Sequence, residues 1–176
     1  GFIAVAVAIP TLLLRIATAL SPLWGLLTPV LLALTALTMT LGNLVGLAQS
    51  NIKRLLAYST IGQVGYLMLG IMANTTRGVE AMALYLVAYL FMNLGAFACV
   101  AAVWNSSRSE SLEAFRGLAR RSPALAFCLT LLLLSLAGIP PMVGFFGKFL
   151  LFGAAVESQL MWLALVAVVN SAIALF

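Results

Sequence analysis

Long apolar runs separated by short polar connectors dominate the chain. The runs cover residues 2–20, 27–49, 55–73, 79–104, 123–156 and 160–176. A helix needs about 20 mainly apolar residues to cross the hydrocarbon core of a bilayer, and each run is close to that length or longer. The pattern therefore predicts an all-α fold, a bundle of transmembrane helices that crosses the membrane several times.

The composition supports this prediction. The chain is 64% hydrophobic and only 7% charged, whereas soluble domains carry about 25% charged residues. An apolar run begins at residue 2 without a signal-peptide pattern, and the last run continues to residue 176. We therefore expect residues 1–176 to form a single membrane domain that is a fragment of a longer protein.

The basic residues sort onto two sides if the connectors alternate across the membrane. One side receives Arg15 and Arg77, and the other side receives Lys53, Arg54, Arg108, Arg116, Arg120 and Arg121. Lysine and arginine are enriched in cytoplasmic loops, so the second side is predicted to be cytoplasmic. The net charge of +5 comes from these scattered loop residues, which is not the pattern of a nucleic-acid-binding protein.

The run 123–156 is too long for one crossing. Its 34 residues would make a helix of roughly 51 Å, whereas the hydrocarbon core is about 30 Å thick. Gly138, Pro140 and Pro141 are predicted to break the helix near its middle, because proline brings no N–H and disrupts helical hydrogen bonds. The carbonyls near Leu136 and Ala137 should then lose their partners, as in the discontinuous helices that line ion sites in transporters.

Lys148 follows this break by about two helical turns. A lysine at the bilayer centre costs at least about 2.5–3.5 kcal/mol and is by default a functional residue. We interpret Lys148 as a group that gains and loses a proton during transport. The alternative is an interfacial lysine whose side chain extends to the headgroups.

Other polar residues within the runs extend the candidate site. The best cluster combines Tyr58, Ser59 and Thr60 with Gln63, and we add Lys53 and Tyr85 as further members of a possible polar axis. Further intramembrane polar residues are Asn43, Tyr66, Tyr89, Asn93, Ser135 and Asn170. Taken singly, each is more typical of a hydrogen bond between helices than of a proton relay, and Lys53 is more typical of a cytoplasmic anchor.

The sequence offers little to hold a cofactor or metal. It contains no histidine and only four acidic residues, and it lacks a glycine-rich phosphate loop after a predicted strand. We therefore predict that no cofactor and no metal bind to this chain.

Three segments carry a resemblance to a known family. They are 42–66, 89–98 and 134–149, the last of which ends in GFFGKF. Together they resemble the antiporter-like subunits of respiratory complex I. The resemblance is strongest to the subunit N type of bacterial NADH–quinone oxidoreductase and to its counterpart in the cyanobacterial and chloroplast complex.

The resemblance implies a fold of about 14 helices, of which this chain would cover the second half of helix 8 to helix 13. Lys148 would be the lysine of the broken helix 12, on a central polar axis. The implied function is proton translocation coupled to quinone reduction, with NADH, FMN, iron–sulfur clusters and quinone on other subunits. The implied partners are other membrane subunits of complex I and the lipid bilayer, in a cell inner membrane or a thylakoid membrane.

Two other functions remain open from the sequence. The chain could belong to a sodium/proton antiporter, which would exchange the two ions without NADH or quinone. It could also be a non-transporting scaffold subunit, in which case Lys148 would tolerate replacement by alanine or leucine.

Overall fold

The computed structural model describes residues 24–175, and these residues form helices joined by short connections. The helices are α2 (Trp24–Leu47), α3 (Ile52–Met72), α4 (Thr76–Ser107), the 3-10 turn η2 (Leu112–Phe115), α5 (Leu118–Arg121), α6 (Pro123–Ala137), α7 (Val143–Glu157) and α8 (Met161–Ile173). Among the described residues, the one β-type pairing is an isolated bridge between Asn51 and Ser111. The predicted all-α class is confirmed.

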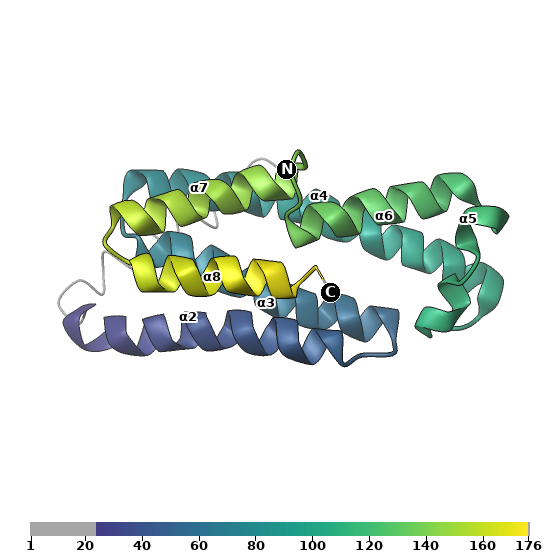
Figure 1. Ribbon diagram of the computed structural model, residues 1–176, viewed down its shortest axis with the longest axis horizontal. Coiled ribbons are helices and arrows are strands. Elements are labelled where there is room, and N and C mark those ends of the chain that lie inside the picture. Colours follow the sequence, from purple (N-terminus) through teal and green to yellow (C-terminus); the bar gives the residue numbers. More distant parts are fainter. Residues whose placement is uncertain (1–23, 176) are drawn as a thin grey trace.

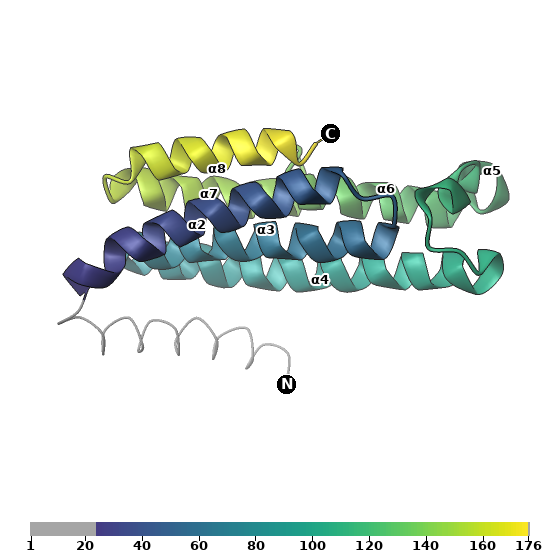
Figure 2. The same cartoon turned by 90° about the horizontal axis from the view of Figure 1, so that it is seen from below.

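The long helices lie roughly side by side, as Figure 1 shows. Helices α6 and α7 follow one another along the length of α4, and both pack against it. Helix α2 packs against α3, and α8 packs against α2 and α7 (Figure 2). The end of α6 and the buried face of α7 therefore lie inside the bundle, whereas Pro140 and Pro141 in the connection between them are exposed.

The predicted membrane crossings agree with the helices. In the described part of the chain, Gly25–Leu47, Ile52–Met72 and Thr76–Ser107 are long and apolar enough to span a membrane. The run 123–156 is split into α6 and α7, and 160–176 contains α8. The predicted run 2–20 lies outside the described residues.

Local chemistry explains several helix ends. The Asn51 side chain accepts hydrogen bonds from the backbone N–H groups of Lys53 (2.9 Å) and Arg54 (3.2 Å) at the start of α3. Thr75 caps α4 in the same way, by accepting from the Gly78 N–H at 3.1 Å. Such caps satisfy backbone donors that have no partner within the helix.

Small residues allow α2 and α3 to pack closely. A Cβ atom added to Gly42 would lie 2.8 Å from the Gly62 Cα, and one added to Gly62 would lie 2.8 Å from the Asn43 Oδ1. Both distances are shorter than van der Waals contact. The Gly42 position requires glycine, because its neighbour is backbone, whereas the neighbour of Gly62 is the end of the Asn43 side chain. The close approach brings the polar side chains of α2 next to those of α3.

The charged residues gather at the helix ends, as the topology prediction requires. The start of α3, the end of α4 and the segment 108–121 lie at one end of the bundle (Figure 1). The segment 110–121 contains the turn η2 and the short helix α5. Arg77, at the start of α4, pairs with Glu157, at the end of α7. The described part of the chain thus has one strongly basic end.

Candidate functional site: a lysine across a broken helix

The break between α6 and α7 follows directly from the two prolines. Helix α6 ends at Gly138, whose φ of 91° lies in the left-handed region that glycine adopts readily. The next helix begins at Val143. Residues 140 and 141 occupy the positions whose N–H groups would bond to the carbonyls of Leu136 and Ala137 in a continuous helix. Because both are proline, these two carbonyls face the bundle interior without a helical partner.

Lys148 supplies the missing donors. Its Nζ donates to the carbonyl oxygens of Leu136 and Ala137, each at 3.0 Å, and to the Ser171 Oγ at 3.3 Å. The residue is only 2% exposed. An ammonium at the C-terminal end of α6 also interacts favourably with the helix dipole. In the structure, the Lys148 side chain therefore points into the bundle and not toward its surface.

An aromatic ring provides a further contact for the ammonium. The Lys148 Nζ lies 4.5 Å from the centre of the Tyr66 ring, within the range of a cation–π interaction. Tyr66 is fully buried. Among residues 24–175, the ion pairs of the structure join other residues, so carbonyls, a hydroxyl and a ring face surround this charge.

Gln63 and Tyr85 belong to the same hydrogen-bonded group. The Gln63 Nε2 donates to the Leu136 carbonyl at 3.3 Å, and the Tyr85 hydroxyl donates to the Gln63 Oε1. Gln63 is 1% exposed, and Tyr85 is fully buried. The structure therefore places these two predicted residues next to Lys148, through the shared carbonyl of Leu136.

The structure places Lys53, the other lysine of the predicted polar axis, apart from this group. It lies ten residues before Gln63 in α3, about 15 Å along the helix. Its Nζ pairs with the Glu110 Oε1 at 2.5 Å and lies 5.4 Å from the centre of the Trp104 ring. Hydrogen bonds from Lys53 and then from Asn51 hold the pKa of Glu110 below its usual range. Lys53 therefore anchors the segment after α4 at the basic end.

Tyr58 and Ser59 are also separate from Lys148. Both are half-buried, and they lie nearer than Gln63 to the basic end of α3. Ser59 lines a cavity that is described below, whereas Tyr58 packs with its Cβ against the position of Gly46. Within the predicted cluster, Ser59 and Gln63 thus share one face of α3 and both line the cavity. Only Gln63 reaches the carbonyl of Leu136 at the break.

The structure adds Ser171, which the sequence analysis did not single out. Its hydroxyl donates to the Ala137 carbonyl at 3.1 Å, beside the Lys148 Nζ. Its neighbour Asn170 was recognised as an intramembrane polar residue, and it accepts from the Asn43 Nδ2 through its carbonyl at 3.1 Å. The Asn43 Nδ2 also lies 3.4 Å from the Tyr66 hydroxyl. The signal in the sequence was the polar pair 170–171 inside an apolar run.

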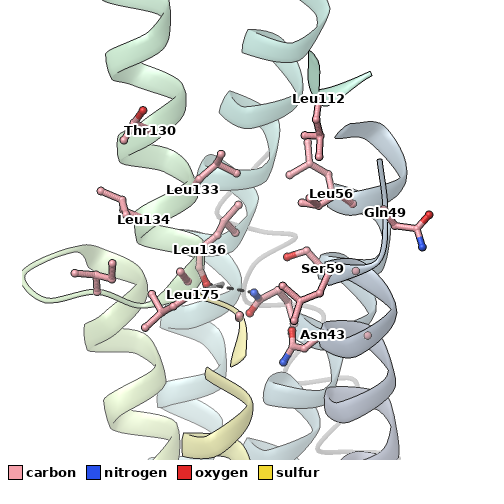
Figure 3. A pocket seen from close by; sticks show the side chains of 18 residues that line it. Asn43, Gln49, Leu56, Ser59, Leu112, Thr130, Leu133, Leu134, Leu136 and Leu175 are labelled. Carbon is pink, nitrogen blue, oxygen red and sulfur yellow. Dashed lines mark hydrogen bonds between the residues drawn. The ribbon is translucent and has the colours of Figure 1, made fainter. Parts of the chain in front are cut away.

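A cavity of about 470 Å³ lies between α2, α3 and α6 and the end of α8 (Figure 3). Gln49 and Leu112 lie at one end of it, near the basic end of the bundle. At the other end its walls include Gln63, Leu136 and Ala137. The cavity therefore reaches the residues whose groups hold Lys148.

The described residues contain no group of three or more His, Cys, Asp or Glu side chains placed to bind a metal. Cys99 is buried and Cys128 is exposed, and both are free thiols. The chemistry available at the site is that of one ammonium group and its hydrogen-bond acceptors. Such a group can bind, hold and release a proton.

Comparison with known proteins gives a consistent result. Residues 2–174 match the family model described as NADH:quinone oxidoreductase/Mrp antiporter, TM. The chain is 49% identical over 152 residues to NADH-quinone oxidoreductase subunit N 2 of Acidobacterium capsulatum, covering 84% of this chain and 31% of that protein. It is 47% identical over 144 residues to NAD(P)H-quinone oxidoreductase subunit 2 of Trichodesmium erythraeum, covering 82% of this chain and 27% of that protein.

A solved structure shows the same fold. A chain of respiratory complex I from Thermus thermophilus with bound aureothin superposes with a TM-score of 0.72 and 37% sequence identity. The match covers 83% of this chain and 33% of that chain. The chain thus spans about a third of the length of the relatives that it matches.

Proposed function

The chain belongs to the NADH:quinone oxidoreductase/Mrp antiporter transmembrane family, and from this premise we propose that it forms part of a proton-translocating membrane subunit of NADH–quinone oxidoreductase. The single observation that carries the proposal is the buried Lys148, held by the two carbonyls that the broken helix leaves free. Lys148 is the residue that takes up and releases the proton.

The other residues of the site have supporting roles. Gly138, Pro140 and Pro141 create the break, and thereby the two acceptors that receive the ammonium. Gln63 and Tyr85 form the neighbouring part of the polar axis, because Gln63 shares the Leu136 carbonyl with Lys148.

The driving force is electrostatic. A unit charge that appears about 8 Å from Lys148 would interact with it by roughly 2 kcal/mol at an effective dielectric constant of 20. This energy corresponds to more than a tenfold change in the ratio of the two protonation states. Quinone reduction elsewhere in the complex would bias Lys148 by changing the charge along the polar axis.

The proposal also covers the full-length subunit, its partners and its membrane. Residues 1–176 form one piece of a membrane domain of about 14 helices, from the second half of helix 8 to helix 13. The subunit packs with other membrane subunits of complex I and with lipid. NADH, FMN, iron–sulfur clusters and quinone bind to other subunits. The membrane is a bacterial inner membrane, or a thylakoid membrane if the source is photosynthetic.

The test replaces Lys148 by alanine in the full-length subunit. Electron transfer from NADH to quinone and acidification are recorded together in inverted membrane vesicles. We expect acidification to be lost, with or without a parallel loss of electron transfer. Arg116→Ala is the matched control, because it removes a cation whose side chain is 81% exposed at the basic end, and it should retain both activities.

The same experiment separates transport from a scaffold role. A Lys148→Ala complex that assembles and keeps normal rates of both reactions would overturn the proposal. The lysine would then serve only to cap the end of α6. Lys148→Arg is a useful companion, because arginine retains the charge and the donors but does not release its proton in proteins.

Sodium/proton antiport is the second candidate, because the matched family also includes Mrp antiporters. The observation that would favour it is proton movement that depends on sodium and proceeds without NADH or quinone. Vesicles energised by a sodium gradient alone distinguish the two functions. Proton movement in these vesicles, absent in Lys148→Ala, would assign the site to antiport.

A further inference from the structure

The basic end of the bundle carries more positive than negative charge. It comprises the start of α3, the end of α4 and the segment 108–121, which lie together in Figure 1. The two acidic residues there are Glu110 and Glu113, and the six basic residues are Lys53, Arg54, Arg108, Arg116, Arg120 and Arg121. The buried side chains of Ile52, Val103 and Leu118 belong to one apolar cluster, so α3, α4 and α5 are held together beneath these charges.

Both acidic residues at this end are already paired. Glu110 pairs with Lys53 at 2.5 Å, and its other carboxylate oxygen accepts from the Asn51 amide at 3.0 Å. Glu113 pairs with Arg116 at 3.3 Å. In the described part of the chain, the other arginines of the basic end therefore have no carboxylate left to bind.

Three arginines at this end have no acidic partner among residues 24–175. They are Arg54, Arg108 and Arg120, and all three are exposed. Arg108 lies over the Trp104 ring, 4.9 Å from its centre. Arg121 is tied to the protein instead, because its Nη2 donates to two backbone carbonyls at 2.7 Å and 3.0 Å. Three guanidinium groups thus face outward with their charge unbalanced.

Apolar side chains are exposed close to these arginines along the chain. Phe127 is 63% exposed and lies one turn into α6, seven residues after Arg120. Leu112, in η2, is 38% exposed. A phospholipid has its phosphate above its acyl chains, so a charged end next to an apolar helix face matches a lipid. An acidic partner protein would gain little from the exposed ring of Phe127.

We propose that the basic end binds the headgroup of an anionic phospholipid of the cytoplasmic leaflet, with Arg120 as the principal contact and an acyl chain against Phe127. Arg54 and Arg108 add attraction at longer range, because basic clusters beside membrane helices attract anionic lipids. Arginine suits the contact, since its guanidinium donates two parallel hydrogen bonds to phosphate oxygens. The inference is independent of proton transfer by Lys148 and needs only that the helices span a membrane.

Quenching by brominated lipids tests the preference for an anionic headgroup. Cys128 is exposed and adjacent to Phe127, so it carries a bimane fluorophore in the full-length subunit within its complex, with Cys99→Ala. A Cys128→Ala complex gives the background from other thiols. The complex is reconstituted into mixtures of phosphatidylcholine and phosphatidylglycerol, of which one or the other is brominated on its acyl chains. The ratio of the two quenching curves gives the relative binding constant of the lipids beside α6.

The inference predicts a preference for phosphatidylglycerol that depends on the free arginines. Arg120→Gln should lower the preference about fivefold, the effect expected for one basic residue near a membrane surface. Arg54→Gln, a second variant without a side-chain bond to lose, should lower it in the same direction. Arg77→Gln is the matched control, because Arg77 is exposed at the opposite end and paired with Glu157. It should leave the preference unchanged, and so should Lys148→Ala.

Four outcomes would overturn the inference. Equal quenching by the two lipids would mean that no headgroup is selected, and no quenching by either would mean that another protein covers this surface. A preference that survives Arg120→Gln in full would place the headgroup elsewhere. Loss of the preference when millimolar inorganic phosphate is added at constant ionic strength would mean that the basic end recognises a free phosphate ion and not a lipid.

Discussion

Replacing Tyr66 by leucine removes the aromatic face that contacts the Lys148 ammonium but leaves an apolar side chain in the core. The Nζ lies 4.5 Å from the ring centre, and Tyr66 is fully buried. Desolvated cation–π contacts contribute about 2 kcal/mol or more. The neutral amine gains nothing comparable from the ring. Removing the ring therefore destabilises mainly the ammonium form of Lys148.

The lost cation–π energy predicts a measurable shift in the pH profile of proton movement. About 2 kcal/mol corresponds to a factor of roughly 30 in the ratio of ammonium to amine, and to about 1.5 units on a pH axis. We therefore expect the pH profile of proton movement in Tyr66→Leu to move toward acid by that amount. Tyr66→Phe should keep most of the parent profile, because it retains the ring and loses only the hydroxyl, which lies 3.4 Å from the Asn43 amide and also bonds to the Ser171 side chain.

The assay records acidification by inverted vesicles between about pH 5.5 and 8.5, with the assembled complex quantified in each variant. A merely structural role for Tyr66 would lower the amount of complex without moving the profile. An unmoved profile in assembled Tyr66→Leu would refute the reasoning. A Tyr66→Phe profile that moves as far as that of Tyr66→Leu would assign the effect to the hydroxyl instead.

Two further predictions concern packing and the basic end of the bundle. Gly42→Ala places a Cβ 2.8 Å from the backbone Cα of Gly62, and such overpacking costs about 1–3 kcal/mol. It should therefore lower the melting temperature of the purified protein relative to Gly153→Ala, which meets nothing within 4 Å. Equal melting temperatures would contradict the close packing of α2 and α3. Lys53→Ala removes the partner that holds the pKa of Glu110 low, so hydrogen exchange at the Leu112 N–H, which donates to the Ser50 carbonyl at 3.0 Å, should be faster than in the parent at pH 7. A carboxyl with a lowered folded-state pKa stabilises the fold above its unfolded pKa and loses this effect as the pH falls through the folded value, so the difference should vanish in acid, and a difference that persists there would refute the ionic explanation.

The broken helix was predictable because its cause is local. Two consecutive prolines remove two N–H groups, and the helical repeat alone identifies the carbonyls of Leu136 and Ala137 as the ones left without partners. The burial of Lys148 was also predictable, because a charged residue far inside an apolar run has few alternatives to the interior of the bundle.

The partners of the lysine were not predictable in the same way. Tyr66 and Ser171 meet Lys148 from α3 and α8, which are distant in sequence, so their contact depends on the rotation and relative shift of whole helices. Gln63 and Ser59 show the difficulty: they are one helical turn apart, yet only Gln63 bonds to the Leu136 carbonyl. The pairing of Lys53 with Glu110 was not predictable either, because it depends on how the loop after α4 folds back.

The arrangement of donors around the break supports the proposal that Lys148 changes its protonation state. An ammonium has three N–H donors and a neutral amine has two, so a lysine that served only as a cap would leave a buried acceptor unpaired on losing its proton. Here each carbonyl has a second donor: Gln63 for Leu136 at 3.3 Å, and Ser171 for Ala137 at 3.1 Å. An unpaired buried polar group would cost about 1–3 kcal/mol, and these two donors remove that cost. Lys148 can therefore lose its proton without leaving a buried carbonyl at the end of α6 unpaired. A permanently charged cap would not need these second donors.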